Sequence, residues 1–571
     1  MPASGTRWCW VGAAWLALAG VARGEFIPLA VNQGHCEFVL STPLKENQFY
    51  LIVGSLAEAA RGTRISVRTD TDPGPESLPL ESAAPEPAWK THVEAQAQFL
   101  DRERGRRPAL QRFPPLASPP PAKVFHLFTG DRDLEKPANY QAVHAELAGV
   151  GRLAQVYLDR DDRDLPGMTG TIAEVLRIFD QDVGPAADEH LGRVLDVDRD
   201  GRFTILLTGK LSGLQNGKVQ VDGFVRGSDF FRDLPAPFGN RCDMLYLNAA
   251  LKPGPHLRAV MAHEFTHAVT FCEHALTAYH EGPTNQDEES WLSEGLAHLV
   301  ENPHEFGWSN LDYRISAFLS RPERHPLVVA DYFGAGLWRH PATRGAAYLF
   351  LNSCRTHGDG GLTRRLIQSP LRGIANLEAA TQKPFAELFR QATVDFLDPR
   401  NYGYLDRDRK GPFLYGPRFQ EIPLAGGRAE NTVAGSAAAF FLLHSPAGSH
   451  ARLKVDSDGP VQVTLVRVPS AVPRLSLRWL DAGGPVRLEL TAHHGTVILH
   501  GASWEAASAT EQQLANSASL FSRGRLLAGQ SVTSGPLALP WENGDSERVF
   551  KILGEDAQGH PVAAWIGWPV R

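Results

Sequence analysis

Two histidines and a glutamate interrupt an apolar run, and they constrain this chain more than any other feature. In "RAVMAHEFTHAVTFCEH", residues 258–274, they stand at His263, Glu264 and His267. Residues four apart on a helix project from one face, about one turn from each other. Two imidazoles in that arrangement can coordinate one zinc ion, and the adjacent glutamate can take a proton from a zinc-bound water. The neighbouring residues are apolar or small, as a packed helix requires.

A zinc site also needs a third protein ligand. The segment "SWLSEGLAHLVEN", residues 290–302, has helical spacing and carries Glu294, twenty-seven residues after His267. The polar connection between the two segments is long enough to bring the second helix alongside the first. Two histidines and one glutamate form a ligand set that leaves a fourth position open for water. The pattern therefore predicts a zinc site made by His263, His267 and Glu294.

Two other interpretations of this motif stay open. The histidines could be satisfied core residues of an ordinary helix, which would require both the motif and the third ligand to arise by chance. The site could also bind zinc without catalysing a reaction. Glu264 argues against this second interpretation, because a non-catalytic site would be expected to lose that residue.

The pair "HEFTHAVTF" and "WLSEGLAHLVE" resembles the gluzincin metallopeptidases, in which a W-L-N-E-G type helix supplies the third ligand. The later "RGAAYLFLNSC" and the C-terminal β-region are more similar to the hyicolysin-like secreted metallopeptidases than to thermolysin. The resemblance covers roughly residues 123–425. It implies a zincin-like domain, a Zn²⁺ cofactor and a protein or peptide substrate. By the resemblance, Glu264 is the general base, and His263, His267 and Glu294 are the metal ligands.

The second helix departs from the family pattern at two positions. Ser293 stands where the helix often has asparagine, and His298 stands where thermolysin-type enzymes carry an aspartate that orients a histidine. Glu301, seven residues after Glu294 and on the same helical face, is a candidate substitute for that aspartate. An ordinary surface glutamate is the alternative.

A tetrahedral oxyanion needs a hydrogen-bond donor in addition to the zinc. Related enzymes use a tyrosine or a histidine for this purpose. The candidates downstream are Tyr332, Tyr348 and His340. Tyr348 also fits the composition of a packed helix face, where it would be a core aromatic.

The first 122 residues predict an export signal, a β-module and a linker. Residues 1–24 are typical of a signal peptide, with Arg7 before an apolar stretch too short to cross a bilayer, and cleavage is expected before Glu25. An uncleaved anchor is the alternative. Residues 25–70 alternate as short strands do and predict an N-terminal β-module or a prosegment. Residues 71–122 are rich in proline and predict a linker.

We expect an α+β multidomain chain, with a zincin-like metallopeptidase domain at 123–425 and a C-terminal β-sandwich-like region at 426–571. Within the domain, "KVFHLFTG" and "LAQVYLD" predict strands, "NYQAVHAELAGVG" predicts a helix between them, and "CDMLYLNA" predicts a strand before the first zinc helix. The segment "LDVDRDGRFTILLTG" resembles half of a calcium loop, but Leu207 occupies the position of the bidentate glutamate. A tight Asp-Gly turn into a strand is therefore favoured.

Composition sets further limits. The net charge is −7, and no concentrated basic region gives support for a nucleic-acid partner. We expect no membrane span in the mature chain, a monomer, and a secreted or extracytoplasmic location. Cleavage would leave Cys36, Cys242, Cys272 and Cys354, enough for up to two disulfides in an exported protein.

The sequence favours an exported zinc peptidase that uses Glu264 as general base. Two alternatives remain from the same residues. One is a surface-binding or adhesion protein whose zinc site is structural or vestigial. The other is a zinc hydrolase that acts on an ester.

Overall fold

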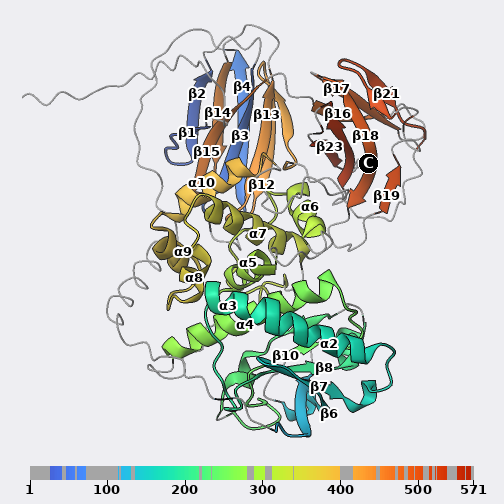
Figure 1. Cartoon of the computed structure of the whole chain (residues 1–571). Coiled ribbons are helices and arrows are strands. Elements are labelled where there is room, and N and C mark those ends of the chain that lie inside the picture. The colour runs from blue at the N-terminus through green and yellow to red at the C-terminus, as the bar shows by residue number, and fades with distance from the viewer. Residues whose placement is uncertain are drawn as a thin grey trace, which may run out of the picture.

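The computed structural model describes residues 26–71, 118–398, 416–505 and 513–567, apart from short gaps within these ranges. Figure 1 shows an α+β chain: a β-sandwich and a second β-unit lie at one end, a mixed sheet lies at the other, and a layer of helices lies between them. The predicted signal peptide, its cleavage site and most of the predicted linker lie outside the described residues.

The mixed sheet has six strands in the order β5-β6-β7-β8-β10-β9. Strands β7, β8 and β10 are parallel, whereas β5, β6 and β9 pair antiparallel to their neighbours. The parallel strands are buried throughout, as parallel strands covered on both faces are. The six strands are β5 (Ala122–Phe128), β6 (Tyr140–Val150), β7 (Ala154–Asp159), β8 (Phe203–Leu207), β9 (Gly223–Phe224) and β10 (Met244–Leu247).

The prediction of a helix in "NYQAVHAELAGVG" is wrong, because this segment is strand β6. Val143 and Ala145, two residues apart, are both buried, and the residues on either side of each are exposed or half-buried. The strand is hydrogen-bonded to β5 on one side and β7 on the other. Pairing on both edges outweighs the helical spacing of its apolar residues. The strands predicted on both sides of it, and the one before the zinc motif, are confirmed.

The Asp-rich segment forms a turn that leads into β8. Gly201 has a φ of +77°, and its amide donates to Asp196 Oδ2 at 3.1 Å. A lysine ammonium, Lys123 Nζ, lies 2.9 Å from Asp198 Oδ2 in the same turn. The favoured interpretation, a tight turn into a strand, agrees with this geometry.

Helices cover one face of the mixed sheet and then build the middle layer. Helices α2, α3 and α4 pack on the face that carries Val156, Ile205 and Leu245, and they share one core with it. The helices are α2 (Met168–Ile178), α3 (Gly184–His190), α4 (Pro255–Ala278), α5 (Ser290–Glu301), α6 (Asp312–Ser320), α7 (Pro341–Thr356), α8 (Leu362–Ile367), α9 (Gly373–Thr381) and α10 (Phe385–Asp395).

The β-sandwich combines strands from both ends of the chain. One sheet has the order β1-β15-β3-β13-β11 and the other has the order β12-β4-β14-β2, with a shared apolar core. The strands are β1 (Phe26–Leu29), β2 (His35–Leu40), β3 (Asn47–Ser55), β4 (Thr63–Thr71), β11 (Gln420–Pro423), β12 (Arg428–Val433), β13 (Ala438–His444), β14 (Ala451–Ser457) and β15 (Val461–Pro469).

This pairing corrects the predicted domain boundaries. Strand β3, from the expected N-terminal module, lies between β13 and β15, and β4 lies between β12 and β14. Residues 25–70 are therefore not a separate module, and their removal as a prosegment would take central strands out of both sheets. The region 426–571 is divided, since its first part completes the sandwich and the rest forms a unit of its own.

Helix α10 joins the sandwich to the helical layer. Arg390 Nη1 donates to the carbonyl oxygen of Val463 at 3.0 Å and to Thr464 Oγ1 at 2.9 Å. Apolar residues of the sandwich, among them Ile52 and Phe440, belong to the same buried cluster as the helices. The sandwich and the helices therefore share a core.

The second β-unit has a core of its own. It consists of a sheet in the order β16-β17-β21 and a sheet in the order β19-β18-β22-β23, with β20 paired to β18. Its strands are β16 (Arg474–Leu480), β17 (Arg487–His493), β18 (Val497–Glu505), β19 (Gln513–Asn516), β20 (Arg525–Leu526), β21 (Ser531–Thr533), β22 (Val549–Asp556) and β23 (Pro561–Gly567).

The four cysteines expected to form disulfides are all free and buried. Cys36 lies in the sandwich core and Cys242 lies on one face of the mixed sheet, whereas Cys272 and Cys354 lie in the helical core. Cys36 and Cys242 are therefore separated from each other and from the other two by the cores in which they lie, whereas Cys272 and Cys354 share a core and are still free. Among the described residues, no helix is long and apolar enough to cross a membrane.

Helices α6 and α7 approach closely at Gly345, and this contact generates a stability prediction. A Cβ at Gly345 would lie 2.2 Å from the carbonyl oxygen of Arg314, a backbone atom that cannot move aside alone. We expect Gly345→Ala to reduce the free energy of unfolding by about 1–3 kcal/mol or more, measured by thermal and denaturant unfolding.

The matched control is Gly170→Ala in helix α2, where a Cβ would meet no atom within 4 Å. Alanine favours a helix over glycine by up to about 1 kcal/mol, so this variant should be neutral or more stable. Equal losses in the two variants would contradict the close approach at Gly345.

Candidate metal centre

Helices α4 and α5 lie side by side and supply the residues of the predicted zinc motif. Helix α4 begins at Pro255, a favoured first residue, and its apolar residues, Val260 and Val269 among them, are buried in the helical core. Helix α5 lies against it, and its residues Trp291, Leu292 and Leu296 are buried in the same core. The polar residues that remain on the facing sides meet between the helices.

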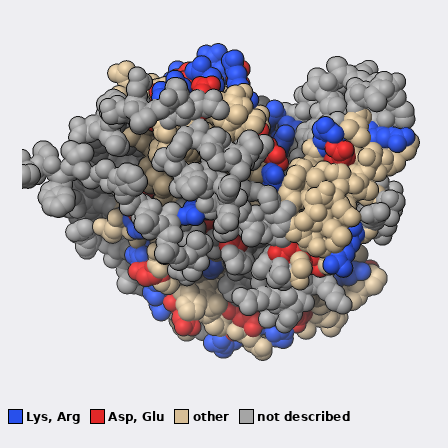
Figure 2. Space-filling view, turned by 90° about the horizontal axis from the view of Figure 1, so that it is seen from above, with Lys and Arg blue, Asp and Glu red and all other residues tan. Residues whose placement is uncertain are grey.

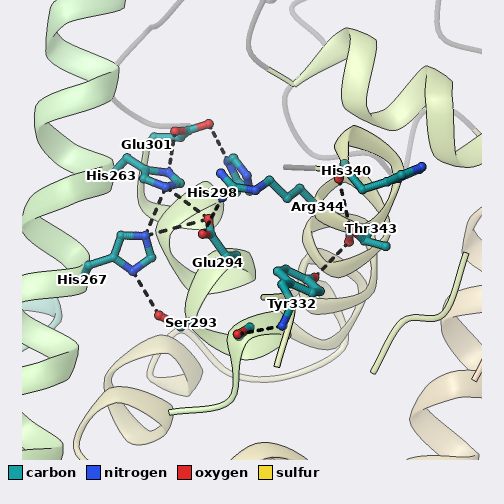
Figure 3. A network of polar contacts seen from close by, with 11 residues as sticks. His263, His267, Ser293, Glu294, His298, Glu301, Tyr332, His340, Thr343 and Arg344 are labelled. Carbon is teal, nitrogen blue, oxygen red and sulfur yellow. Dashed lines mark hydrogen bonds and ion pairs between the residues drawn. The ribbon is translucent and has the colours of Figure 1, made fainter. Parts of the chain in front are cut away.

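Three side-chain atoms converge there. His263 Nε2 and His267 Nε2 are 3.2 Å apart, and Glu294 Oε2 lies 3.3 Å from the first and 3.8 Å from the second (Figure 3). Zinc ligands about 2.1 Å from one ion in a tetrahedral arrangement are about 3.4 Å from each other. The three separations are therefore those expected of zinc ligands.

Glu294 gives a second indication that the group suits a metal. Its Oε2 atom is buried and has no hydrogen-bond partner among the described residues. Burial acts to raise the pKa of Glu294, but Arg344 and the two imidazoles outweigh it and hold the pKa well below its usual value. An ionised, buried carboxylate oxygen that faces two imidazole nitrogens is an electron-pair donor suited to bind a cation.

The other ring nitrogens of both histidines are held by hydrogen bonds. His263 Nδ1 lies 3.0 Å from Glu301 Oε2, and His267 Nδ1 lies 3.0 Å from Ser293 Oγ. A carboxylate only accepts hydrogen bonds, so His263 donates from Nδ1 and directs Nε2 toward Glu294. Such contacts fix the orientation of metal-binding imidazoles.

Glu301 is fully buried and is not a surface glutamate. Its second oxygen, Oε1, accepts a hydrogen bond from His298 Nδ1 at 2.9 Å. Burial acts to raise the pKa of Glu301, but His298 and His263 outweigh it and hold the pKa well below its usual value. Glu301, the candidate substitute for the family's aspartate, therefore contacts His263 through one oxygen and His298 through the other.

Glu264, the predicted general base, lies on α4 next to the edge strand of the mixed sheet. A Cβ at Gly223, in β9, would lie 3.2 Å from Glu264 Cγ, so glycine permits the strand to approach the glutamate. Burial raises the pKa of Glu264 to about 7, with Glu294 acting in the same direction and His263 against it. A carboxyl group with such a pKa can both accept and release a proton near neutral pH.

The three candidates for the oxyanion donor, Tyr332, His340 and Tyr348, lie in helix α7 or in the segment before it. The Tyr332 hydroxyl is buried and donates to the carbonyl oxygen of Thr343 at 3.3 Å, and Tyr348 is buried in the helical core. His340 precedes α7, where its carbonyl oxygen accepts from Thr343 Oγ1 and its ring lies against that of His325. In Figure 3 no hydrogen bond or ion pair joins Tyr332 or His340 to a ligand atom.

Arg344 is a site residue that the sequence analysis missed. It reaches from the first turn of α7 to Glu294, where Nη2 donates to Oε1 at 2.7 Å (Figure 3). Its signal in the sequence was weak: a single cation at the start of an apolar helix. In the sequence Ser293 stands out only as a departure from the family pattern, and no pattern in the sequence points to Gly223.

Comparisons with known proteins agree with this geometry at a coarse level. Over 218 residues the chain is 23% identical to the neutral metalloprotease ShpI of Staphylococcus hyicus, which covers 36% of this chain and 47% of that protein. The relative is a metalloprotease by its name. The similarity spans about half the length of that relative. In the structure, His263, His267 and Glu294 form one group of side chains that could hold a metal ion.

The other comparisons add no argument about fold or function. No protein-family model matches the chain. Solved structures of a β-glucuronidase from Ruminococcus gnavus align with 26% of this chain and 29% of their own, at 10–12% identity and TM-scores of 0.13 and 0.12. TM-scores this low do not establish a shared fold.

The ligand set generates a prediction for Glu294. Glu294→Gln keeps the shape of the side chain and removes the charge that would bind a cation. We expect the zinc dissociation constant, measured by competition with a chelator, to rise by at least about 100-fold while the fold is retained.

Glu289→Gln is the matched control, because this carboxylate lies just before α5 and bonds to Trp291 Nε1 rather than to the histidines. Its zinc affinity should equal that of the unmodified protein. Full zinc occupancy of Glu294→Gln under mild chelation would exclude Glu294 as the third ligand.

Proposed function

We propose that this protein is a secreted zinc peptidase of the gluzincin type, similar to the hyicolysin-like enzymes, that cleaves peptide bonds in a protein or peptide substrate. The observation that carries the proposal is the convergence of His263 Nε2, His267 Nε2 and Glu294 Oε2 within 3.2–3.8 Å of one another, one residue from Glu264. A zinc ion held by these atoms would supply Lewis-acid activation of water and of the scissile carbonyl group.

In this mechanism Glu264 moves the proton. Its carboxylate accepts a proton from the attacking water and delivers it to the nitrogen of the leaving amine. Glu301 and Ser293 keep the two histidines oriented through their Nδ1 atoms.

The edge of the mixed sheet supports a peptide as the substrate. Strand β9 pairs with β10 on one side and, among the described strands, with none on the other. An extended peptide can add to such an edge through main-chain hydrogen bonds. Because Gly223 of β9 adjoins Glu264, a peptide on this edge would pass beside the general base.

The rest of the proposal follows from the sequence. We propose export through residues 1–24, action as a monomer and no nucleic-acid partner. The face seen in Figure 2 carries basic and acidic side chains mixed with one another, in line with the small net charge. N-terminal sequencing of secreted material that starts at Glu25 would support the export step.

Of the two alternatives, the surface-binding protein fits these contacts less well than a peptidase does, whereas the ester hydrolase is separated from a peptidase only by assay. A surface-binding protein with a vestigial zinc site would have no use for Glu264 beside a sheet edge that can take a peptide. An ester hydrolase would share the same zinc chemistry, and parallel assays on peptide and ester substrates distinguish it from a peptidase.

The central test is Glu264→Gln, which keeps the shape of the side chain and cannot act as a base. General acid–base catalysis contributes about 10²- to 10⁴-fold, so casein hydrolysis should fall by at least that much. Zinc content and thermal stability should stay as in the unmodified protein.

Glu387→Gln is the matched control, because Glu387 is an exposed residue of α10 whose ion pair, among the described residues, is with Lys383 on the surface. It should keep full activity. If Glu264→Gln holds zinc normally and retains more than a tenth of the proteolysis, Glu264 has no part in the mechanism. A protein that binds zinc but shows no hydrolysis before mutation would favour the surface-binding alternative.

A further inference from the structure

The two oxygens of Glu294 have different partners. Oε1 accepts from Arg344 Nη2 at 2.7 Å, and Oε2 faces His263 Nε2 at 3.3 Å and His267 Nε2 at 3.8 Å (Figure 3). Both side chains are mostly buried, with 14% of Arg344 and 8% of Glu294 exposed. Water therefore competes little with this ion pair.

We infer that Arg344 is a positioning residue that makes Glu294 a metal ligand through one oxygen only. The inference rests on the proposed zinc site. A carboxylate can bind a metal through one oxygen or through both. With Oε1 occupied by the guanidinium, only Oε2 is available, and the three protein ligands leave the fourth position that a catalytic zinc site keeps open for water.

The turn that carries Arg344 is itself held in place. Thr343 Oγ1 donates to the carbonyl oxygen of His340 at 2.9 Å, and the Tyr332 hydroxyl donates to the carbonyl oxygen of Thr343 at 3.3 Å. The next residue, Gly345, packs directly on the backbone of α6. Arg344 therefore extends from a fixed helix start, and Tyr332 acts by supporting this turn.

Charge gives a second reason for an arginine here. Two carboxylates, those of Glu294 and Glu301, each lie against His263 and so come close together in a buried setting, where like charges repel. A guanidinium is charged at any pH at which a protein is folded, so Arg344 offsets part of this repulsion without a metal. Glu294 is thus oriented before the metal binds.

The test compares Arg344→Met with Arg355→Met, a control on the same helix whose guanidinium bonds to the neutral side chain of Asn352. Each full-length protein is stripped of metal and titrated with zinc against a chelator, and then with Co²⁺, whose visible absorption is stronger in four-coordinate than in five-coordinate sites. For Arg344→Met we expect a 10- to 100-fold loss of zinc affinity and weaker cobalt bands, because the freed Oε1 can join the coordination.

Arg355→Met should match the unmodified protein in both measurements. Arg344→Lys, which keeps the charge but not the planar fork, provides the test if the methionine variant does not fold, and it should change both readouts in the same direction to a smaller degree. Unchanged zinc affinity and unchanged cobalt bands in a folded Arg344 variant would overturn the inference. A failure of the unmodified protein to bind either metal would instead overturn the proposed function.

Discussion

Helix α5 packs along helix α4 through an apolar contact, and the geometry of the candidate metal centre depends on that contact. Trp291, Leu292 and Leu296 on one helix share a buried core with the apolar face of the other. Leu292 and Leu296 stand two residues before and after Glu294, on the opposite side of α5, so their burial leaves Glu294 facing the two histidines, at 3.3 and 3.8 Å. Gly295 allows α7 to pack closely on another side of α5, since a Cβ at this position would lie 2.6 Å from the Leu351 side chain.

Around that contact, nearly every polar atom near the ligands is directed to a partner. His263 Nδ1 is hydrogen-bonded to Glu301, His267 Nδ1 is hydrogen-bonded to Ser293, and Glu294 Oε1 accepts a hydrogen bond from Arg344. The two Nε2 nitrogens and Glu294 Oε2 instead face one another. Three electron-pair donors that converge in a buried setting are costly unless a cation lies between them, which is the physical argument for a metal at this point.

The sequence was informative where local spacing decides the structure. The four-residue interval between His263 and His267, and the apolar period around Glu294, predicted two helices and their facing residues correctly. The same spacing could not decide whether Glu301 is buried, because that depends on how closely two helices pack. It failed for β6, where two neighbouring strands override a helical pattern, and for Arg344, which meets Glu294 across fifty residues of chain. The pairing of the N-terminal strands with the C-terminal β-region was missed for the same reason, because it joins residues near 50 to residues near 440 and 465.

That long-range pairing has a consequence for the order of folding. Strand β3 needs β13 and β15 as neighbours, so the first strands of the chain cannot complete their sheet until about residue 466 is available. Contacts this distant in sequence form late, because closing so long a loop costs entropy before any contact compensates for it. The helices that carry His263 and Glu294 lie between these strands in the sequence. We therefore expect the helices to form first and to dock through α10 on the sandwich when its sheets are completed. A fragment that ended after α10 would hold every ligand and still lack the strands on which its helical core rests.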